Sequence, residues 1–274
     1  MPELPEVETT RRLLHPDVVG RSITSVSVTR DRMLRRQERP ADFTARLTGK
    51  HIEGTARHGK RLLVLLDDDL VWVIHLGMSG RLSVAEAGSE APPHTHVRVL
   101  LDDDSEVRFT DPRTFGYTLV ATQDELDERW AHGPDAWEEP PSAAELAGRI
   151  EKRKAPIKAL LLDQAIIAGI GNIYADETLF GAGIDPHRQG GSLTLDEIEA
   201  LLDALHRVLG AGIEAGGTTL GDMAYLLPDG RSGEYTTELA VYGREDEPCP
   251  RCGDSVRRDI IRSRSTFWSQ GCQA

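Results

Sequence analysis

Residues 23–120 repeat one pattern, in which short apolar or alternating segments are separated by Gly, Asp and Ser. Short segments at this spacing are typical of β-strands joined by tight turns, and they favour an antiparallel sandwich or barrel. The segments expected to form strands are residues 23–29, 51–57, 61–66, 70–76, 96–101, 106–110 and 116–120. We therefore predict an antiparallel β-sandwich in the first half of the chain.

A short helix is expected before these strands. Pro5 is a suitable first helical residue, and Val7, Leu13 and Leu14 recur among Glu and Arg at helical spacing. This pattern predicts an amphipathic helix that ends near His15-Pro16.

Beyond residue 131 the character of the sequence changes twice. A Pro- and acid-rich stretch, 132–142, ends the strand pattern, and apolar residues then recur every three or four positions as far as about residue 216. Short strand-like runs rich in Gly and Pro follow. The fold class is therefore α+β, with an N-terminal helix plus antiparallel β-sandwich, an α-rich domain and a C-terminal hairpin. The expected domains are residues 1–131, 142–228 and 238–274.

The chain carries 32 basic and 45 acidic side chains, a formal net charge of −13. This sum argues against nucleic acid, because phosphate binding requires Lys and Arg. However, residues 1–61 hold 13 basic and 8 acidic side chains, which could form one electropositive face. No run approaches the ~18 apolar residues of a membrane-spanning helix, and the N-terminus has no signal-like stretch. We therefore expect a soluble, cytoplasmic protein without a membrane partner.

Three cysteines lie in the last 26 residues, and their odd number favours a metal site over disulfides in a cytosolic chain. Cys249-x-x-Cys252 and Ser269-x-x-Cys272 have the outline of two knuckles that share one tetrahedral Zn²⁺. A neutral Ser hydroxyl is a poor zinc donor. Two interpretations stay open: a three-thiolate site completed by water or Ser269, and a metal-free hairpin held by Phe267-Trp268.

Two turns bounded by glycine are expected at strand ends. Met78 lies in the turn 75–80, and Arg113 and Phe115 lie in the turn 111–116. These side chains, if exposed, would suit insertion into a stack of nucleic-acid bases. Met and Phe in the core are the alternative for each turn considered alone.

A third glycine-rich turn, Gly169-Ile-Gly-Asn172, lies between two helical stretches. Its glycines let backbone N–H groups approach an anion, and a helix N-terminus at Asn172 would bind phosphate. Turns of this kind between packed helices are also commonly structural.

The N-terminus offers an unusual nucleophile. Pro2 becomes the first residue if Met1 is removed, and its secondary amine can form an iminium with a sugar C1′. Glu3 and Glu6 are beside it and could transfer protons. The alternative is an inert terminus.

These motifs together resemble the formamidopyrimidine-DNA glycosylase (Fpg/MutM) branch of the Fpg/Nei family, and the resemblance covers nearly the whole chain. The motifs that carry it are Pro2-Glu-Leu-Pro-Glu-Val-Glu-Thr, Gly59-Lys60, His75-Leu-Gly-Met-Ser-Gly, Asp111-Pro-Arg-x-Phe-Gly, Gly169-Ile-Gly-Asn-Ile-Tyr-Ala-Asp-Glu, Gly217-Thr-Thr-Leu, Val241-Tyr-Gly-Arg and Pro248-Cys-x-x-Cys-Gly. The implied fold is a β-sandwich, a helix-two-turns-helix domain and a C-terminal zinc-binding hairpin.

The resemblance implies a bifunctional DNA glycosylase and AP lyase that excises oxidised purines such as 8-oxoguanine and formamidopyrimidines. Pro2 is then the Schiff-base nucleophile, Glu3 the acid/base that assists sugar-ring opening, Lys60 the proton donor for β-elimination, and Arg264 the residue of δ-elimination. The residues implied to contact DNA are His75, Met78, His94, Arg113, Phe115, Lys154 and Asn172. Met78, Arg113 and Phe115 fill the gap that a flipped nucleotide leaves.

The implied zinc ligands are Cys249, Cys252 and Cys272, with Ser269 in the fourth position. The implied partner is damaged double-stranded DNA, bound by a monomer. The replacement of a thiolate by Ser269 predicts weakly held zinc, and the net acidity predicts weak, salt-sensitive binding. Two alternatives remain: a Nei-like preference for oxidised pyrimidines, and a non-catalytic lesion-binding protein. No motif in residues 221–237, where base recognition is expected, distinguishes the lesions.

Overall fold

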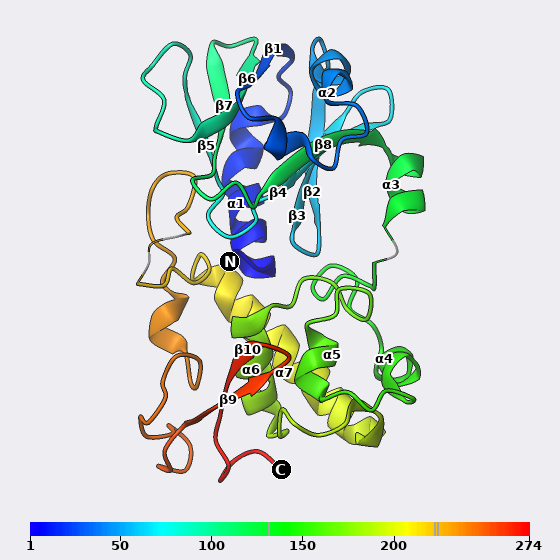
Figure 1. The fold of residues 1–274 in the computed structure, drawn as a ribbon, viewed down its shortest axis with the longest axis vertical. Helices are drawn as coiled ribbons and strands as arrows, with labels where there is room; N and C mark the ends of the chain where they lie inside the picture. Colours follow the sequence, from blue (N-terminus) through cyan, green and yellow to red (C-terminus); the bar gives the residue numbers. More distant parts are fainter. Residues whose placement is uncertain (131, 222, 224) are drawn as a thin grey trace. The chain divides into compact units, whose positions relative to one another are not determined.

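The computed structural model describes residues 1–130, 132–221, 223 and 225–274 (Figure 1). The chain divides into two compact units. The sandwich unit comprises Met1–Ala131 and Ala215–Glu234, and the helical unit comprises His132–Glu214 and Tyr235–Ala274.

Two antiparallel four-stranded sheets form the sandwich unit, with the strand orders β1-β6-β7-β5 and β2-β3-β4-β8 (Figure 1). The strands are β1 (Ile23–Val28), β2 (Ile52–His58), β3 (Arg61–Leu66), β4 (Leu70–His75), β5 (Arg81–Glu86), β6 (Thr95–Leu101), β7 (Ser105–Thr110) and β8 (Tyr117–Thr122). Because side chains alternate along a strand, β3 places Leu62 and Val64 in a core that both sheets share. Leu63 and Leu65 pack on the opposite face of the same sheet.

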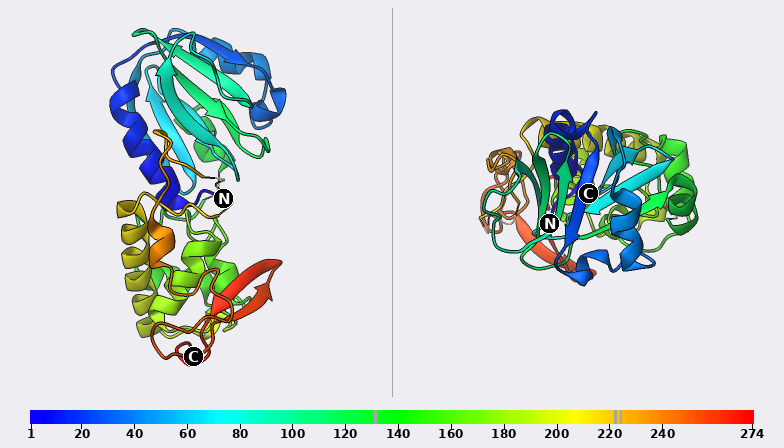
Figure 2. Two further views of the ribbon diagram at one scale, coloured as in Figure 1. Left: turned by 90° about the vertical axis from the view of Figure 1, so that its left-hand side faces the viewer. Right: turned by 90° about the horizontal axis from the view of Figure 1, so that it is seen from above.

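The helices of this unit cover the sheets. They are α1 (Leu4–Val18), η1 (Asp31–Leu34), α2 (Pro40–Leu47) and α3 (Gln123–Arg129). Helix α1 contacts β2, β3 and β5, and Figure 2 shows it lying along the strands. Leu126 of α3 packs on Val71 and Leu119, so β4 and β8 are covered on both faces. This burial explains their nearly continuous apolar sequences.

The helical unit contains helices α4 (Ala143–Ile150), α5 (Ile157–Leu161), α6 (Asn172–Ala182) and α7 (Leu195–Glu214), the short helices η2 (Gly190–Ser192) and η3 (Tyr235–Glu238), and the hairpin strands β9 (Arg257–Ile261) and β10 (Arg264–Trp268). Helix α6 packs on α7, where a Cβ at Gly212 would lie 2.6 Å from the Tyr174 ring. Glycine therefore permits the close approach of the two helices. The hairpin strand β10 contacts α6.

The predicted fold class is confirmed, and the structure adds elements that the sequence pattern does not predict. Strand β5 has only Leu82 and Val84 as large apolar residues, so the alternation of apolar and polar residues that would identify it as a strand is weak. Helix α1 continues past its expected end to Val18, because Val18 is buried while the exposed Pro16 costs a single i to i−4 hydrogen bond near the helix end. The segment Ala215–Glu234 groups with the sandwich unit, although residues 142–228 were expected as one domain. Within the described residues, none of the helices has both the length and the apolar character needed to cross a membrane.

Candidate active site and nucleic-acid interface

The N-terminal end of α1 is a buried, hydrogen-bonded position. Pro2 is buried, and Glu3, the N-cap residue of α1, is 2% exposed. The backbone N–H of Glu3 donates to Oε2 of Glu6 at 2.7 Å. Both side chains lie at the start of α1, and negative charge is favourable at a helix N-terminus. The structure thus holds Pro2 beside two carboxyl groups.

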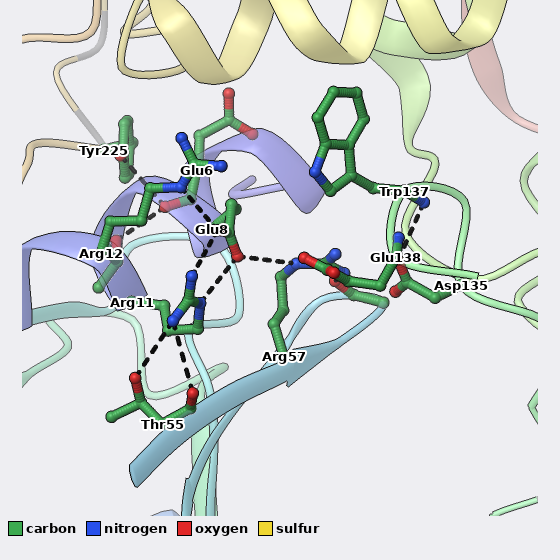
Figure 3. A network of polar contacts seen from close by, with 12 residues as sticks. Glu6, Glu8, Arg11, Arg12, Thr55, Arg57, Asp135, Trp137, Glu138 and Tyr225 are labelled. Carbon is green, nitrogen blue, oxygen red and sulfur yellow. Dashed lines mark hydrogen bonds and ion pairs between the residues drawn. The ribbon is translucent and has the colours of Figure 1, made fainter. Parts of the chain in front are cut away.

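Glu6 also holds the segment that follows α7 in the chain. Its Oε1 accepts a hydrogen bond from the backbone N–H of Thr218 at 2.7 Å. The hydroxyl of Tyr225 donates to the backbone carbonyl of Glu6 at 3.3 Å (Figure 3). A Cβ at Gly217, whose φ is +83°, would lie 2.8 Å from the Glu6 side chain. Burial and the nearby Glu6 charge raise the pKa of Tyr225, which therefore stays a hydrogen-bond donor.

A buried carboxylate with three guanidinium partners lies further along α1. Glu8 accepts from Arg11 at 2.7 and 2.9 Å and from Arg12 at 2.7 Å, and it lies 3.4 Å from Nε of Arg57 (Figure 3). Burial alone would raise the pKa of Glu8, but the hydrogen bonds from Arg11 and Arg12 and the charges of Arg11 and Arg57 lower it below its usual value. Glu8 is therefore ionised at neutral pH.

Arg57 connects α1 with the turn that carries Lys60. Its Nη1 donates to the carbonyl of Gly59 at 3.0 Å, and Gly59 has a φ of +56° in the tight turn between β2 and β3. Lys60, the next residue, is half-buried. The sequence did not reveal this link, because Glu8 and Arg57 are far apart in the chain and no sequence pattern pairs them.

His75 lies at the end of β4, opposite Arg61 in the neighbouring strand β3. Burial, followed by the charges of Arg61, Lys60 and Arg35, lowers the pKa of His75 to about 3. Its ring is therefore neutral. Because Nδ1 accepts from the backbone N–H of Gly77 at 3.1 Å, the proton is on Nε2. His75 can therefore donate one hydrogen bond from Nε2, for example to a phosphate oxygen.

The turns 76–80 and 111–116 are bound to each other through Asp111. This carboxylate is fully buried and accepts hydrogen bonds from the Ser79 hydroxyl at 2.6 Å, the Gly116 N–H at 2.7 Å and the Arg113 N–H at 3.2 Å. A Cβ at Gly77 would lie 2.3 Å from the backbone nitrogen of Gly116. Only glycine permits so close a contact between the two turns.

This arrangement brings the three expected intercalating side chains onto adjacent turns. Phe115 is 41% exposed, and the exposed Arg113 guanidinium lies 4.8 Å from its ring centroid. Met78, on the other turn, is half-buried. Arg35 donates to the carbonyl of Phe115 at 2.5 Å and so supports the turn from the side of η1. His94 is exposed beside the same turn, where its carbonyl accepts from the Asp111 N–H at 3.0 Å.

The remaining expected residues belong to the helical unit. Asn172 begins α6, and its Nδ2 donates to the carbonyl of Ser265 in β10 at 2.9 Å. Arg264, the first residue of β10, is exposed. Lys154 is exposed in the loop between α4 and α5. Asn172 and the strand that carries Arg264 are therefore in direct contact.

The three cysteines meet at the far end of the hairpin. The Sγ atoms of Cys249, Cys252 and Cys272 lie within 4.8 Å of one another, and Sγ of Cys252 lies 3.4 Å from Oγ of Ser269. Ser269 is fully buried, and its backbone N–H donates to the Gln273 side chain at 2.8 Å. Three thiols and one oxygen at these separations fit the tetrahedral donor set that Zn²⁺ prefers.

Comparisons with known proteins agree over the full chain. Residues 1–118 match the family profile described as the formamidopyrimidine-DNA glycosylase N-terminal domain, and residues 132–224 match the formamidopyrimidine-DNA glycosylase H2TH domain. A formamidopyrimidine-DNA glycosylase of Geobacillus kaustophilus is 42% identical over 276 residues, covering 100% of both chains.

Solved structures give the same result. The MutM (Fpg) protein of Thermus thermophilus is 39% identical with a TM-score of 0.88, covering 99% of this chain and 98% of the other. The Lactococcus lactis Fpg in a complex with DNA containing an abasic site is 32% identical with a TM-score of 0.90, covering 100% of both chains.

Proposed function

This chain belongs to the formamidopyrimidine-DNA glycosylase family, and we propose that it is a bifunctional DNA glycosylase and AP lyase of base excision repair. Its substrate is damaged double-stranded DNA, from which it excises oxidised purines as a monomer. The observation that carries the proposal is the start of α1, where Pro2 and Glu3 are buried beside Glu6 and where Arg57 connects the helix with the turn that carries Lys60.

The covalent step uses the amine of Pro2 after removal of Met1. The nitrogen lone pair forms a bond to C1′ as the glycosidic C1′–N bond breaks, and the base leaves with a proton. The C1′–O4′ bond then opens to give the iminium, with Glu3 supplying the proton to O4′. Lys60 serves as proton donor for β-elimination, and Arg264 binds phosphate and promotes δ-elimination. The buried setting of Pro2 and Glu3 supports this assignment, because it limits the access of water to the amine and the carboxyl group.

DNA is held by phosphate contacts and by side chains that replace the flipped nucleotide. The proposed phosphate contacts are His75, His94, Lys154, Asn172 and Arg264. Met78, Arg113 and Phe115 replace the stacking lost when the base is extruded, a loss of a few kcal/mol. The neutral, singly donating state of His75 supports its role as a hydrogen-bond donor that adds no charge. The net charge of −13 should make binding weak, and binding should weaken further with salt because cationic side chains contact the phosphates.

The cysteine cluster is proposed to hold a structural Zn²⁺. Cys249, Cys252 and Cys272 supply three thiolates, and Ser269 or a water molecule completes the set. Bound zinc would stabilise the end of the hairpin opposite Arg264 and supplies no step of the reaction.

Borohydride trapping tests the catalytic proposal, because only an enzyme that forms an imine is captured on DNA. Duplexes containing 8-oxoguanine, a formamidopyrimidine, an oxidised pyrimidine or an abasic site are compared side by side. We expect trapping and strand cleavage with the oxidised purines, a sharp loss of trapping for Pro2→Gly, and none for a variant with an N-terminal extension.

The controls identify each alternative. Full trapping by the extended variant would refute Pro2 as the nucleophile. A preference for the oxidised pyrimidine would replace the substrate proposed here, and binding to lesions without any trapping would indicate a non-catalytic protein. Glu53→Gln, an exposed substitution on β2, serves as the matched control and should leave trapping unchanged.

A further inference from the structure

Strand β10 of the hairpin is attached to the helices by a buried ion pair. Lys158 of α5 and Asp176 of α6 lie 2.8 Å apart, and both side chains are 0% exposed. Nζ of Lys158 also donates to the carbonyl of Ser265 at 2.7 Å and to the hydroxyl of Thr266 at 3.0 Å. The other carboxylate oxygen of Asp176 accepts from the backbone N–H of Phe267 at 3.0 Å. The pair therefore binds three consecutive residues of β10.

These contacts reach the backbone of Arg264 itself. The Thr266 hydroxyl, which accepts from Lys158, donates in turn to the carbonyl of Arg264 at 3.3 Å. Thr266 is fully buried, so this hydroxyl has a fixed direction. Arg264 is exposed at its side chain but is held at its main chain by a chain of hydrogen bonds that begins at Asp176. An isolated two-stranded hairpin is marginally stable in water, so attachment must come from such contacts.

We propose that Lys158 and Asp176 are positioning residues that hold Arg264 in place for its step on the DNA strand, and that they do so independently of the metal cluster. The proposal rests on the proposed function, since it concerns the action of Arg264. Neither residue is part of the site assigned above, and neither touches the reacting atoms.

The independence from the metal follows from the order of attachments along β10. The ion pair holds residues 265–267, next to Arg264, whereas the cysteine cluster and Ser269 follow the other end of the strand. That end has its own attachment, because the Gln273 side chain donates to the carbonyl of Ile184 at 2.9 Å. Loss of the metal should therefore disturb the C-terminal end first, and loss of the ion pair should disturb Arg264 first.

The burial of the pair explains why both partners are required. A buried charge that loses its partner is strongly unfavourable, whereas replacement of both by apolar side chains is often tolerated. Single substitutions therefore displace the hairpin. The double substitution K158M/D176L restores an apolar contact between α5 and α6 but removes the hydrogen bonds of Lys158 and Asp176 to residues 265–267, while that from Asn172 to Ser265 remains. Comparison of the single and double substitutions therefore distinguishes a loss of stability of the helical unit from a loss of the placement of Arg264.

The experiment measures two products on a duplex with a preformed abasic site. K158M, D176N and K158M/D176L are compared with the unmodified protein for the ratio of δ- to β-elimination product and for borohydride trapping. We expect the ratio to fall about tenfold in all three variants, the effect of one hydrogen bond to a charged group, with trapping within about twofold of the original. K158R, which keeps the charge and donors, should recover part of the ratio. Asp203→Asn, an exposed substitution on α7, is the matched control.

A chelator arm and a hydrogen-exchange arm complete the test. Chelation of the unmodified protein should lower the ratio less than K158M does, and amide exchange in residues 264–268 should rise in K158M more than in the chelated protein. An unchanged ratio in a folded K158M/D176L, or a chelator effect equal to that of K158M, would overturn the proposal. If the unmodified protein forms no trapped complex, the proposed function fails, while the exchange arm still reports whether the pair holds β10.

Discussion

Each unit contains a buried carboxylate that accepts hydrogen bonds from cationic side chains, but the two have opposite pKa shifts. Glu8 in the sandwich unit faces three guanidinium groups, and they lower its pKa although burial opposes them. Asp176 in the helical unit has one ammonium partner and one backbone N–H, and burial raises its pKa to about 7 against the lowering effects of Lys158 and Phe267. Burial favours the neutral form of both carboxyl groups, and the number of cationic donors therefore decides whether it is outweighed.

This difference assigns different properties to the two attachments. The contact between α1 and the turn of Lys60 depends on a carboxylate that stays ionised at physiological pH. The contact between α6 and β10 depends on a carboxylate whose charge changes near neutrality. We therefore expect the geometry around Pro2 and Lys60 to be insensitive to pH between 6 and 8, and the placement of Arg264 to respond to it.

The largest expected effect tests the stronger of the two attachments. Glu8→Ala removes the carboxylate that three guanidinium groups share, among them Arg57, whose side chain is 0% exposed, and this should lower the free energy of unfolding by about 3–5 kcal/mol. Urea denaturation of the purified protein measures this, with Glu53→Ala, an exposed substitution, as the control within about 0.5 kcal/mol of the original. A loss below about 1 kcal/mol for Glu8→Ala would show that the guanidinium groups find other partners and that the comparison is wrong.

Asp111 extends the comparison of Glu8 and Asp176 to a buried carboxylate without a cationic hydrogen-bond donor among the described residues. It accepts hydrogen bonds from one hydroxyl and two backbone N–H groups. Asp111→Ala removes the hydrogen bond from Ser79 that joins the turns of Met78 and Arg113, together with two hydrogen bonds that hold the turn 111–116 itself. Each bond to a charged group contributes about 1.5–3 kcal/mol, so excision of an oxidised purine should fall at least about tenfold. Cleavage at a preformed abasic site should fall less, because that substrate has no base to unstack and extrude. Equal losses on the two substrates would contradict a role of these turns in extrusion.

The pH dependence of stability separates the two carboxylates directly. The folded-state pKa of Asp176 is raised to about 7, so the folded protein binds the proton more tightly than the unfolded chain between about pH 4 and 7. The contribution of this group to the free energy of unfolding therefore falls as the pH rises through that window, by about 1 kcal/mol per pH unit, and is level above it. For Glu8 the sign is opposite, since its stabilisation is present above its unfolded pKa and is lost as the pH falls through the lower folded value.

The measurement is the difference in unfolding free energy between the unmodified protein and D176N at several pH values. The free energy of unfolding of the unmodified protein minus that of D176N should fall steadily from pH 5 to 7 and stay constant from pH 7.5 to 9. A difference that is constant across the whole range would mean that Asp176 does not titrate in this window.

The sequence predicted the local features of this molecule well and its long-range polar contacts poorly. Short apolar or alternating segments separated by turn residues located seven of the eight strands described in the sandwich unit, because such segments report that one or both faces of a strand are buried. Glycine-bounded motifs located the turns 76–80 and 111–116. By contrast, nothing in the sequence pairs Glu8 with Arg57 or Lys158 with Ser265, since these partners are 49 and 107 positions apart. Such pairings depend on the tertiary fold that brings the elements together.

The smallest expected effect concerns the metal cluster. Ser269 supplies an oxygen where a thiolate would bind zinc more tightly, so the unmodified protein should hold zinc below one equivalent or release it readily to a chelator. Ser269→Cys should raise the zinc content towards one per chain and slow its release. The δ- to β-elimination ratio should change by less than about twofold, because Lys158 and Asp176, and not the metal, hold the Arg264 end of β10.

Metal analysis of protein purified without added zinc, together with a chelator release assay, checks both parts. The substitution is sterically small, and the site is buried next to Cys252, so the added sulfur can join the existing cluster without displacing the hairpin. One tightly held zinc in the unmodified protein, unaffected by Ser269→Cys, would show that Ser269 does not weaken the site. A large rise in the elimination ratio on Ser269→Cys would instead show that the metal controls Arg264, and the contrast between the two ends of β10 would have to be abandoned.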